Sequence, residues 1–272
     1  MLGYYHPSNI LGTSIISRMS DPNDIVPTVW SATHGAQGSP FVFAIAADNG
    51  VITVDESANL HVMLDQPSEV LAVECLAQHP SVVLGGTRDG YIRFFDVRDR
   101  TKPRHASIGT IKHPSSVTKI KQLSDHVIAV AGLHSTLCNY DLHFSKPRPQ
   151  GKAWPYWYWQ HTKEPEIGGD EVSDPVVLYP GHCNSAHVEL GFDVDVDAGI
   201  IAAAQIDPYR TVSIFSCKTG DLLKSLHVKD TQASSSCDKA DVKALKFVPD
   251  RGNEHMKSLW VAKGTRIIRF AW

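Results

Sequence analysis

Apolar and polar residues alternate with a period of two over much of this chain, in short runs that end at turn residues. The clearest case is residues 82–96, where two such runs flank the Asp-Gly pair at 89–90. Asp-Gly supplies the positive backbone dihedrals of a two-residue turn, and the alternation gives each strand one buried face. Residues 82–96 are therefore predicted to form a β-hairpin. The predicted faces of its second strand carry Ile92 and Phe94 on one side, and Tyr91, Arg93 and Phe95 on the other.

The same pattern of strand, loop, strand, turn and strand recurs five times along the chain. The predicted central hairpins of the five copies are residues 44–54, 83–95, 127–140, 200–215 and 259–270. Equivalent third strands end at Val54, Phe95 and Tyr140, close to the spacing of roughly 40 to 45 residues that is typical of propeller blades. Short fourth strands are expected at residues 61–64, 107–111, 176–179 and 222–227, and none after Phe270.

This period predicts an all-β protein, a β-propeller with five readable four-stranded blades. Residues 85–98 resemble the central hairpin of a WD-repeat blade, with Phe95 where the repeat usually has Trp. The resemblance implies a WD-repeat β-propeller whose five readable blades are part of a seven-bladed ring. Residues 27–272 are assigned to the propeller. Residues 1–26 are assigned either to the remnant strand of a further blade or to a strand that closes the last one. Residues 144–175 are predicted to be a long inserted loop, because Pro, Gly and charged residues surround its aromatic centre.

The charge and the cysteines of the chain exclude some classes of protein. The 272 residues carry a net charge of −3 with both signs mixed along the chain, so there is no basic field to attract nucleic acid. The five cysteines are isolated and odd in number, which favours reduced thiols. Because no apolar stretch of about 18 residues occurs, no membrane span is expected. We therefore expect a soluble nuclear or cytoplasmic protein that binds neither membranes nor nucleic acid.

An aromatic-Asp-x-basic ending follows two of the predicted third strands, as residues 95–98 and, in weakened form, as residues 140–143. One interpretation is structural, with the aromatic ring between blades and the polar pair completing the strand end. The other is functional, because Arg98 on the rim of a blade would offer a planar, two-point donor to an acidic partner. An exposed ion pair contributes only about 0.2 to 1 kcal/mol, so it orients a partner without supplying a whole interface.

The residues also support a resemblance to a known family. The runs that carry it are residues 69–98, 113–118, 181–182, 191–195 and 200–205. They resemble WD-repeat proteins of the DDB1- and cullin-4-associated factor 4 group, which are similar to substrate receptors of cullin-RING ubiquitin ligases. The resemblance implies four adaptor-binding residues: Asp96, Arg98, Asp141 and His143. Phe95 stands where the family has Trp, and His143 stands where it has Arg, so docking is expected to be weaker than in the family.

The inserted loop contains a second candidate surface. Its five large aromatic residues are Trp154, Tyr156, Trp157, Tyr158 and Trp159. Such side chains are favoured at binding hot spots, so the loop is a candidate for anchoring a partner. The alternative is that the rings fill grooves between blades, and the sequence leaves the two interpretations evenly balanced.

Several histidines and polar residues are assigned to networks inside the blades. In WD repeats a histidine before the first strand bonds the Ser or Thr and the Asp of its own blade. The residues assigned to this structural role are Thr87, Asp89, His113 and His182. Phe95 lacks the indole N–H that would complete such a network in the second blade. A metal site at His182, Cys183 and His187 is not expected, because the spacing matches no zinc pattern.

Catalysis finds no support in the sequence, which has no nucleophile elbow, phosphate-binding glycine loop or H-E-x-x-H motif. No enzyme activity, cofactor or metal is therefore expected. The predicted function is a non-catalytic protein-interaction module, a substrate receptor that docks on the adaptor of a cullin-RING ligase and holds an unknown substrate protein. The alternative is a general WD-repeat scaffold in a nuclear or cytoplasmic multiprotein complex.

Overall fold

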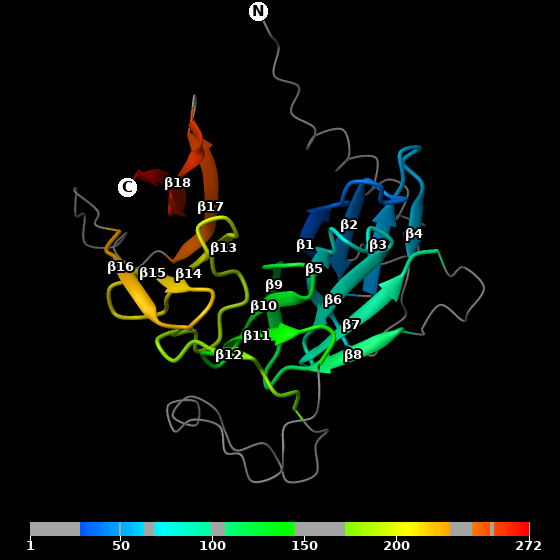
Figure 1. Cartoon of the computed structure of the whole chain (residues 1–272), viewed down its shortest axis with the longest axis horizontal. Coiled ribbons are helices and arrows are strands. Elements are labelled where there is room, and N and C mark those ends of the chain that lie inside the picture. Colours follow the sequence, from blue (N-terminus) through cyan, green and yellow to red (C-terminus); the bar gives the residue numbers. More distant parts are fainter. Residues whose placement is uncertain are drawn as a thin grey trace, which may run out of the picture.

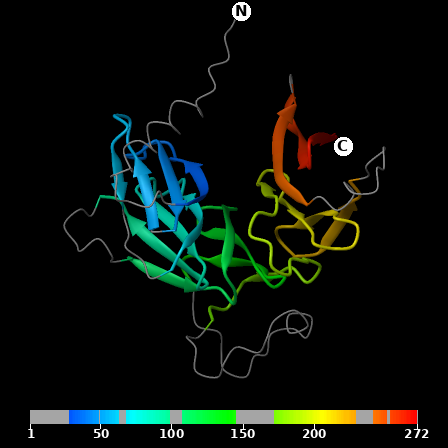
Figure 2. The same ribbon diagram turned by 180° about the vertical axis from the view of Figure 1, so that it is seen from behind.

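The computed structural model describes residues 28–48, 50–62, 68–98, 107–144, 172–228, 241–250 and 253–271. These residues form strands arranged in five antiparallel sheets. Figures 1 and 2 show the sheets following one another round an arc, with the first and last sheets at its two ends. The described residues contain no helix of the length and apolar character needed to cross a membrane.

Each sheet is built from strands in sequence order. The first sheet has β1 (Val29–His34), β2 (Phe43–Ala47), β3 (Gly50–Val54) and β4 (Leu60–Val62). The second has β5 (Val70–Cys75), β6 (Val82–Thr87), β7 (Tyr91–Asp96) and β8 (Gly109–Lys112). The third has β9 (Val117–Gln122), β10 (Val127–Gly132), β11 (Leu137–Asp141) and β12 (Val177–Leu178).

The fourth sheet has β13 (Phe192–Asp195), β14 (Ile200–Ala204), β15 (Val212–Ser216) and β16 (Leu222–Leu226). The fifth has β17 (Val242–Asp250), β18 (Asn253–Lys263) and β19 (Arg266–Phe270). All five predicted hairpins are present, and the all-β propeller prediction is confirmed. The fifth sheet has three strands among the described residues, in line with the expectation that none follows Phe270.

Alternate residues of each strand pack toward the preceding and the following sheet. In β7, Ile92 and Phe94 pack in the cluster that includes Ile120 of the third sheet. Phe95 packs on the opposite side, in a cluster with Val51 of the first sheet. The predicted division of β7 into two faces is confirmed. The core of the molecule is therefore a series of apolar layers between successive sheets, and the sheets present their edges and loops to the surface.

Close approach of the second and third sheets depends on glycine in β6. A Cβ atom added at Gly86 would lie 2.3 Å from Cγ1 of Val117, at the start of β9. Any larger residue at this position would push the two sheets apart. The glycine pair of β6 thus serves packing between blades rather than the turn itself.

The two ends of the arc differ in how their outward faces are covered. In the first sheet, Ile45 and Ile52 belong to a buried cluster made only of residues of that sheet. In the fifth sheet, Leu259 and its neighbours pack against the fourth sheet. Alternation then turns Trp260 and Ile267 outward, where they are 41% and 70% exposed.

Candidate partner-binding sites on the second and third sheets

The first candidate site is the rim pair, Asp96 and Arg98, at the end of β7. Asp96 Oδ1 accepts the backbone N–H of Arg98 at 3.0 Å and its Nε–H at 2.9 Å, while Oδ2 accepts Nη2–H at 2.6 Å. The Arg98 side chain is 70% exposed and that of Asp96 is 18% exposed. Hydrogen bonding to Asp96 raises the pKa of Arg98 above its ordinary value. The guanidinium is therefore held in one orientation on the surface.

The third strands of two other sheets end in the same aspartate turn, but without an arginine. Asp55 Oδ1 accepts the N–H of Ser57 at 2.9 Å after β3, and Asp141 Oδ1 accepts the N–H of His143 at 2.8 Å after β11. An aspartate that bonds the backbone two residues later is a local turn device. The aspartate of the rim pair thus has a structural role shared by the first three sheets, and Arg98 is what distinguishes the second.

The weakened copy of the rim pair is arranged differently. Asp141 bonds His143 through its backbone, and the ring of His143 lies against His126, with ring centroids 4.6 Å apart. Phe144 follows and is 69% exposed. This corner therefore presents aromatic rings in tilted and edge-to-face contact rather than a second two-point cation. The aromatic loop residues assigned to partner binding (Trp154, Tyr156, Trp157, Tyr158 and Trp159) lie outside the described residues.

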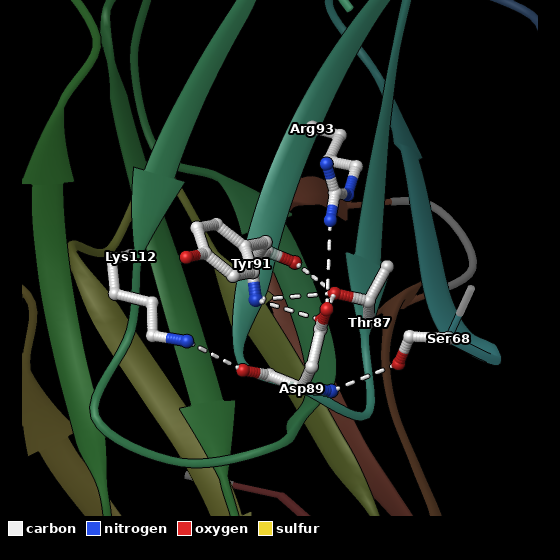
Figure 3. Close-up of polar contacts among 6 residues, drawn as sticks. All are labelled: Ser68, Thr87, Asp89, Tyr91, Arg93 and Lys112. Atoms are coloured by element: carbon white, nitrogen blue, oxygen red, sulfur yellow. Dashed lines mark hydrogen bonds and ion pairs between the residues drawn. The ribbon is translucent and has the colours of Figure 1, made fainter. Parts of the chain in front are cut away.

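A polar network braces the β6–β7 hairpin (Figure 3). The Thr87 hydroxyl shares its one proton between two acceptors, the Asp89 carboxylate and, at 2.9 Å, the carbonyl oxygen of Tyr91, and it accepts the N–H of Tyr91 at 3.1 Å. The N–H of Asp89 donates to Oγ of Ser68 at 3.1 Å. Thr87 is completely buried. The network joins both strands of the hairpin to the segment before β5 and leaves the turn little freedom.

Gly90 connects this hairpin to the third sheet. Its φ of +87° lies in the left-handed region, and an added Cβ would lie 2.8 Å from the carbonyl oxygen of His113. The Gly90 carbonyl accepts the N–H of His113 at 2.8 Å. Only glycine satisfies both the turn conformation and the close approach.

His113 lies in the connection between β8 and β9 and is completely buried against the third sheet. Its Nδ1 lies 3.0 Å from the hydroxyl of Tyr140, and its Nε2 lies 2.8 Å from Oγ1 of Thr136. Burial lowers the pKa of His113 to about 3, so the ring is neutral at physiological pH. Sequence reasoning assigned His113 to a blade network but missed Tyr140. The available signal was that Tyr140 occupies the same place after its turn as Phe95, with a hydroxyl added.

His182 is buried in a different way. It is 6% exposed and its pKa is lowered to about 4 by burial, with the Gln205 side chain opposing that shift. No hydrogen bond joins it to a Ser, Thr or Asp of its blade among the described residues, which differs from the expected pattern. No group of three His, Cys, Asp or Glu side chains that could hold a metal ion occurs in the described part of the chain.

A cavity of about 300 Å³ lies between the inner strand of the first sheet and the start of the fifth. Trp30 of β1 lines one side, and Asp241 and Lys243 line another. Its charges are already matched within the protein, because Asp241 lies 3.2 Å from Nε of Arg210, and Nζ of Lys243 lies 2.6 Å from Glu189. The cavity therefore offers a charged ligand little unmatched charge.

Comparison with known proteins identifies the architecture. No protein-family model matches the chain, and no curated protein matches it. Among solved structures, a chain of the mitotic checkpoint complex superposes with a TM-score of 0.58 at 15% identity, covering 92% of this chain and 64% of that one. The β-propeller domain of Swd1 from Myceliophteria thermophila gives 0.59 at 14% identity, covering 90% and 70%.

The computationally designed Ika8 protein gives a TM-score of 0.56 at 15% identity, covering 92% of this chain and 60% of its own. The chain thus spans less than two thirds of the length of two of these three structures. At such identities the likeness establishes the β-propeller fold and nothing about partners.

Proposed function

We propose that this propeller is a non-catalytic protein-interaction module that docks, through the rim around Arg98, on the adaptor of a cullin-RING ubiquitin ligase and acts as its substrate receptor. The module works by proximity: it holds a substrate protein near a ubiquitin-charged enzyme and raises the local concentration of acceptor lysines. The chemistry takes place on the other subunits of the ligase.

The observation that carries the proposal is the exposed guanidinium of Arg98, held by two hydrogen bonds to Asp96. Because the orientation is set before binding, little side-chain entropy is lost when an acidic partner accepts the remaining N–H groups. A stable interface buries about 1,200 to 2,000 Å² in total, so surfaces next to the rim pair must supply most of the contact.

The test is capture of purified adaptor by the tagged chain. Arg98→Ala is expected to weaken capture several-fold, and Arg98→Lys to restore it only in part, because an ammonium cannot form the two-point contact. Lys243→Ala is the matched control, since Lys243 is 68% exposed and also forms one ion pair, at the other end of the arc. Equal capture by wild type and a folded Arg98→Ala variant would contradict adaptor docking.

A general scaffold remains the second candidate function. It is favoured by the recurrence of the aspartate turn at Asp55 and Asp141, which shows that the aspartate of the motif has a local role wherever it occurs. If the protein is a general scaffold, the wild-type chain captures no adaptor. The Arg98→Ala variant then keeps the other partners of the wild-type chain. The same capture experiment therefore separates the two functions.

A further inference from the structure

A cationic cluster lies at the opposite end of β7 from the rim pair. Nζ of Lys112 lies 3.9 Å from the centroid of the Tyr91 ring, and Cζ of Arg93 lies 4.9 Å from the same centroid. In Figure 3 the Tyr91 ring lies between the two basic side chains. Tyr91 and Lys112 are directly paired across β7 and β8, and Arg93 is two residues further along β7, so the three side chains share one face.

The charge of this cluster is only partly matched. Asp89 is the carboxylate in contact with it, at 3.5 Å from Nη2 of Arg93, and its Oδ1 is already bonded to Thr87. Lys112 donates to the carbonyl of Asp89 at 2.7 Å rather than to its carboxylate. Among the described residues, two cations thus face one carboxylate, and that carboxylate is shared with the turn network.

Burial makes this imbalance costly. The Arg93 side chain is 19% exposed, and its Nε is buried without a hydrogen-bond partner in the described part of the chain. Burial and the nearby charge of Arg93 lower the pKa of Lys112, while Asp89 opposes them. A half-buried pair of cations gains from a nearby anion, because the attraction is stronger than it is in bulk water.

Comparison with the other sheets shows that a cation at the position of Arg93 is not a general requirement of the blade. Arg93 lies three residues before the turn residue Asp96. The equivalent positions in the first, third and fourth sheets carry Ile52, Cys138 and Ser213, all uncharged. The hairpin network of Thr87 and Asp89 accounts for the turn by itself.

We propose that Arg93 and Lys112, spaced by the ring of Tyr91, form a binding site for an oxyanion of a partner polypeptide, supplied either by a phosphorylated side chain or by a carboxylate. The two cations supply donors from adjacent strands, and the braced β6–β7 hairpin holds them in position before binding. This site is separate from the adaptor-docking rim, so one chain has room for two partners.

The experiment titrates inorganic phosphate, and separately glutarate, into the isotopically labelled full chain at constant ionic strength, following the backbone amide signals of Tyr91 and Lys112 by NMR. Saturable shifts at these residues are expected. Lys112→Met and Arg93→Gln should each weaken the apparent affinity about tenfold, because each removes a charge-assisted hydrogen bond. Lys112→Met keeps the aliphatic stem, so it serves if Arg93→Gln impairs folding.

Arg88→Gln is the matched control, since Arg88 lies in the same turn but is paired with Glu69. It should change the affinity less than about twofold. If phosphate alone saturates the site, the partner supplies a phosphorylated side chain. If phosphate and glutarate both saturate it, a carboxylate of the partner is sufficient for binding. Absence of saturable shifts at Tyr91 and Lys112, or equal weakening by Arg88→Gln, overturns the proposal.

Discussion

The second and third sheets share one apolar layer and one architecture, yet they use their polar residues in opposite ways. The third sheet buries His113, Thr136 and Tyr140, which satisfy one another. The second sheet has Phe95 where the third has Tyr140; its buried Thr87 braces the turn, and its charged groups, Asp89, Arg93, Asp96 and Arg98, lie around the turn and the strand ends, where they are partly exposed. A satisfied, buried network stabilises a blade, whereas groups left partly unmatched near the surface remain available to a partner.

The largest expected effect comes from breaking the buried network of the third sheet. His113→Ala removes a ring that is completely buried and leaves a cavity. It also leaves the hydroxyls of Thr136 and Tyr140 without their hydrogen-bond partner on His113. We expect the free energy of unfolding to fall by about 3 to 5 kcal/mol, measured by chemical denaturation. Arg98→Ala is the control from the second sheet and should change it by less than about 0.5 kcal/mol. Similar losses in both variants would remove the distinction between the sheets.

An exchange of one hydroxyl between the sheets tests whether each environment is specific. Tyr140→Phe takes the partner from Nδ1 of His113, and Phe95→Tyr adds a hydroxyl among the apolar side chains of Val51 and Val83. Both changes should destabilise the protein by about 1 to 3 kcal/mol. Thermal melting of the two variants beside wild type is the measurement. A gain in stability for Phe95→Tyr would mean that the second sheet has a polar partner for that position.

Acid should act on the third sheet through His113. Burial lowers its pKa from 6.5 to about 3, so the unfolded chain binds the proton more readily between these values. Its contribution to stability is complete above pH 6.5 and is lost as the pH falls toward 3, at up to about 1.4 kcal/mol per pH unit. Denaturation curves at pH 7, 6 and 5 should therefore show a shallower acid dependence for His113→Ala than for wild type. Parallel slopes would be the contradicting outcome.

Much of the fold follows from local patterns. The Asp-Gly turn and the alternation of residues 82–96 indicate a hairpin from local signals alone, and the repeat of that pattern indicates the number of sheets. Short outer strands are harder to place, because few side-chain contacts define them. The predicted strand at 176–179 is reduced to the two residues of β12.

The site is less accessible to sequence reasoning because its geometry depends on tertiary neighbours. The ion pair of Asp96 with Arg98 is local and visible as a motif. The closeness of Lys112 to Tyr91 depends on the register between β7 and β8, and these strands are joined by a long connection rather than by a tight turn that would fix their register. Likewise, the partners of His113 come from β11 and the turn before it, more than twenty residues away.

The exposed outward face of the fifth sheet has a consequence for how this molecule loses its structure. An arc of sheets behaves as a one-dimensional array, in which each inner member is held by two neighbours and an end member by one. Trp260 and Ile267 remain 41% and 70% exposed on the open side, so this face of the fifth sheet gains less from burial than the faces between sheets. Local opening should therefore begin at β17–β19. The backbone amide hydrogens of these strands should exchange with solvent first, while those of β6 and β10 remain protected from exchange.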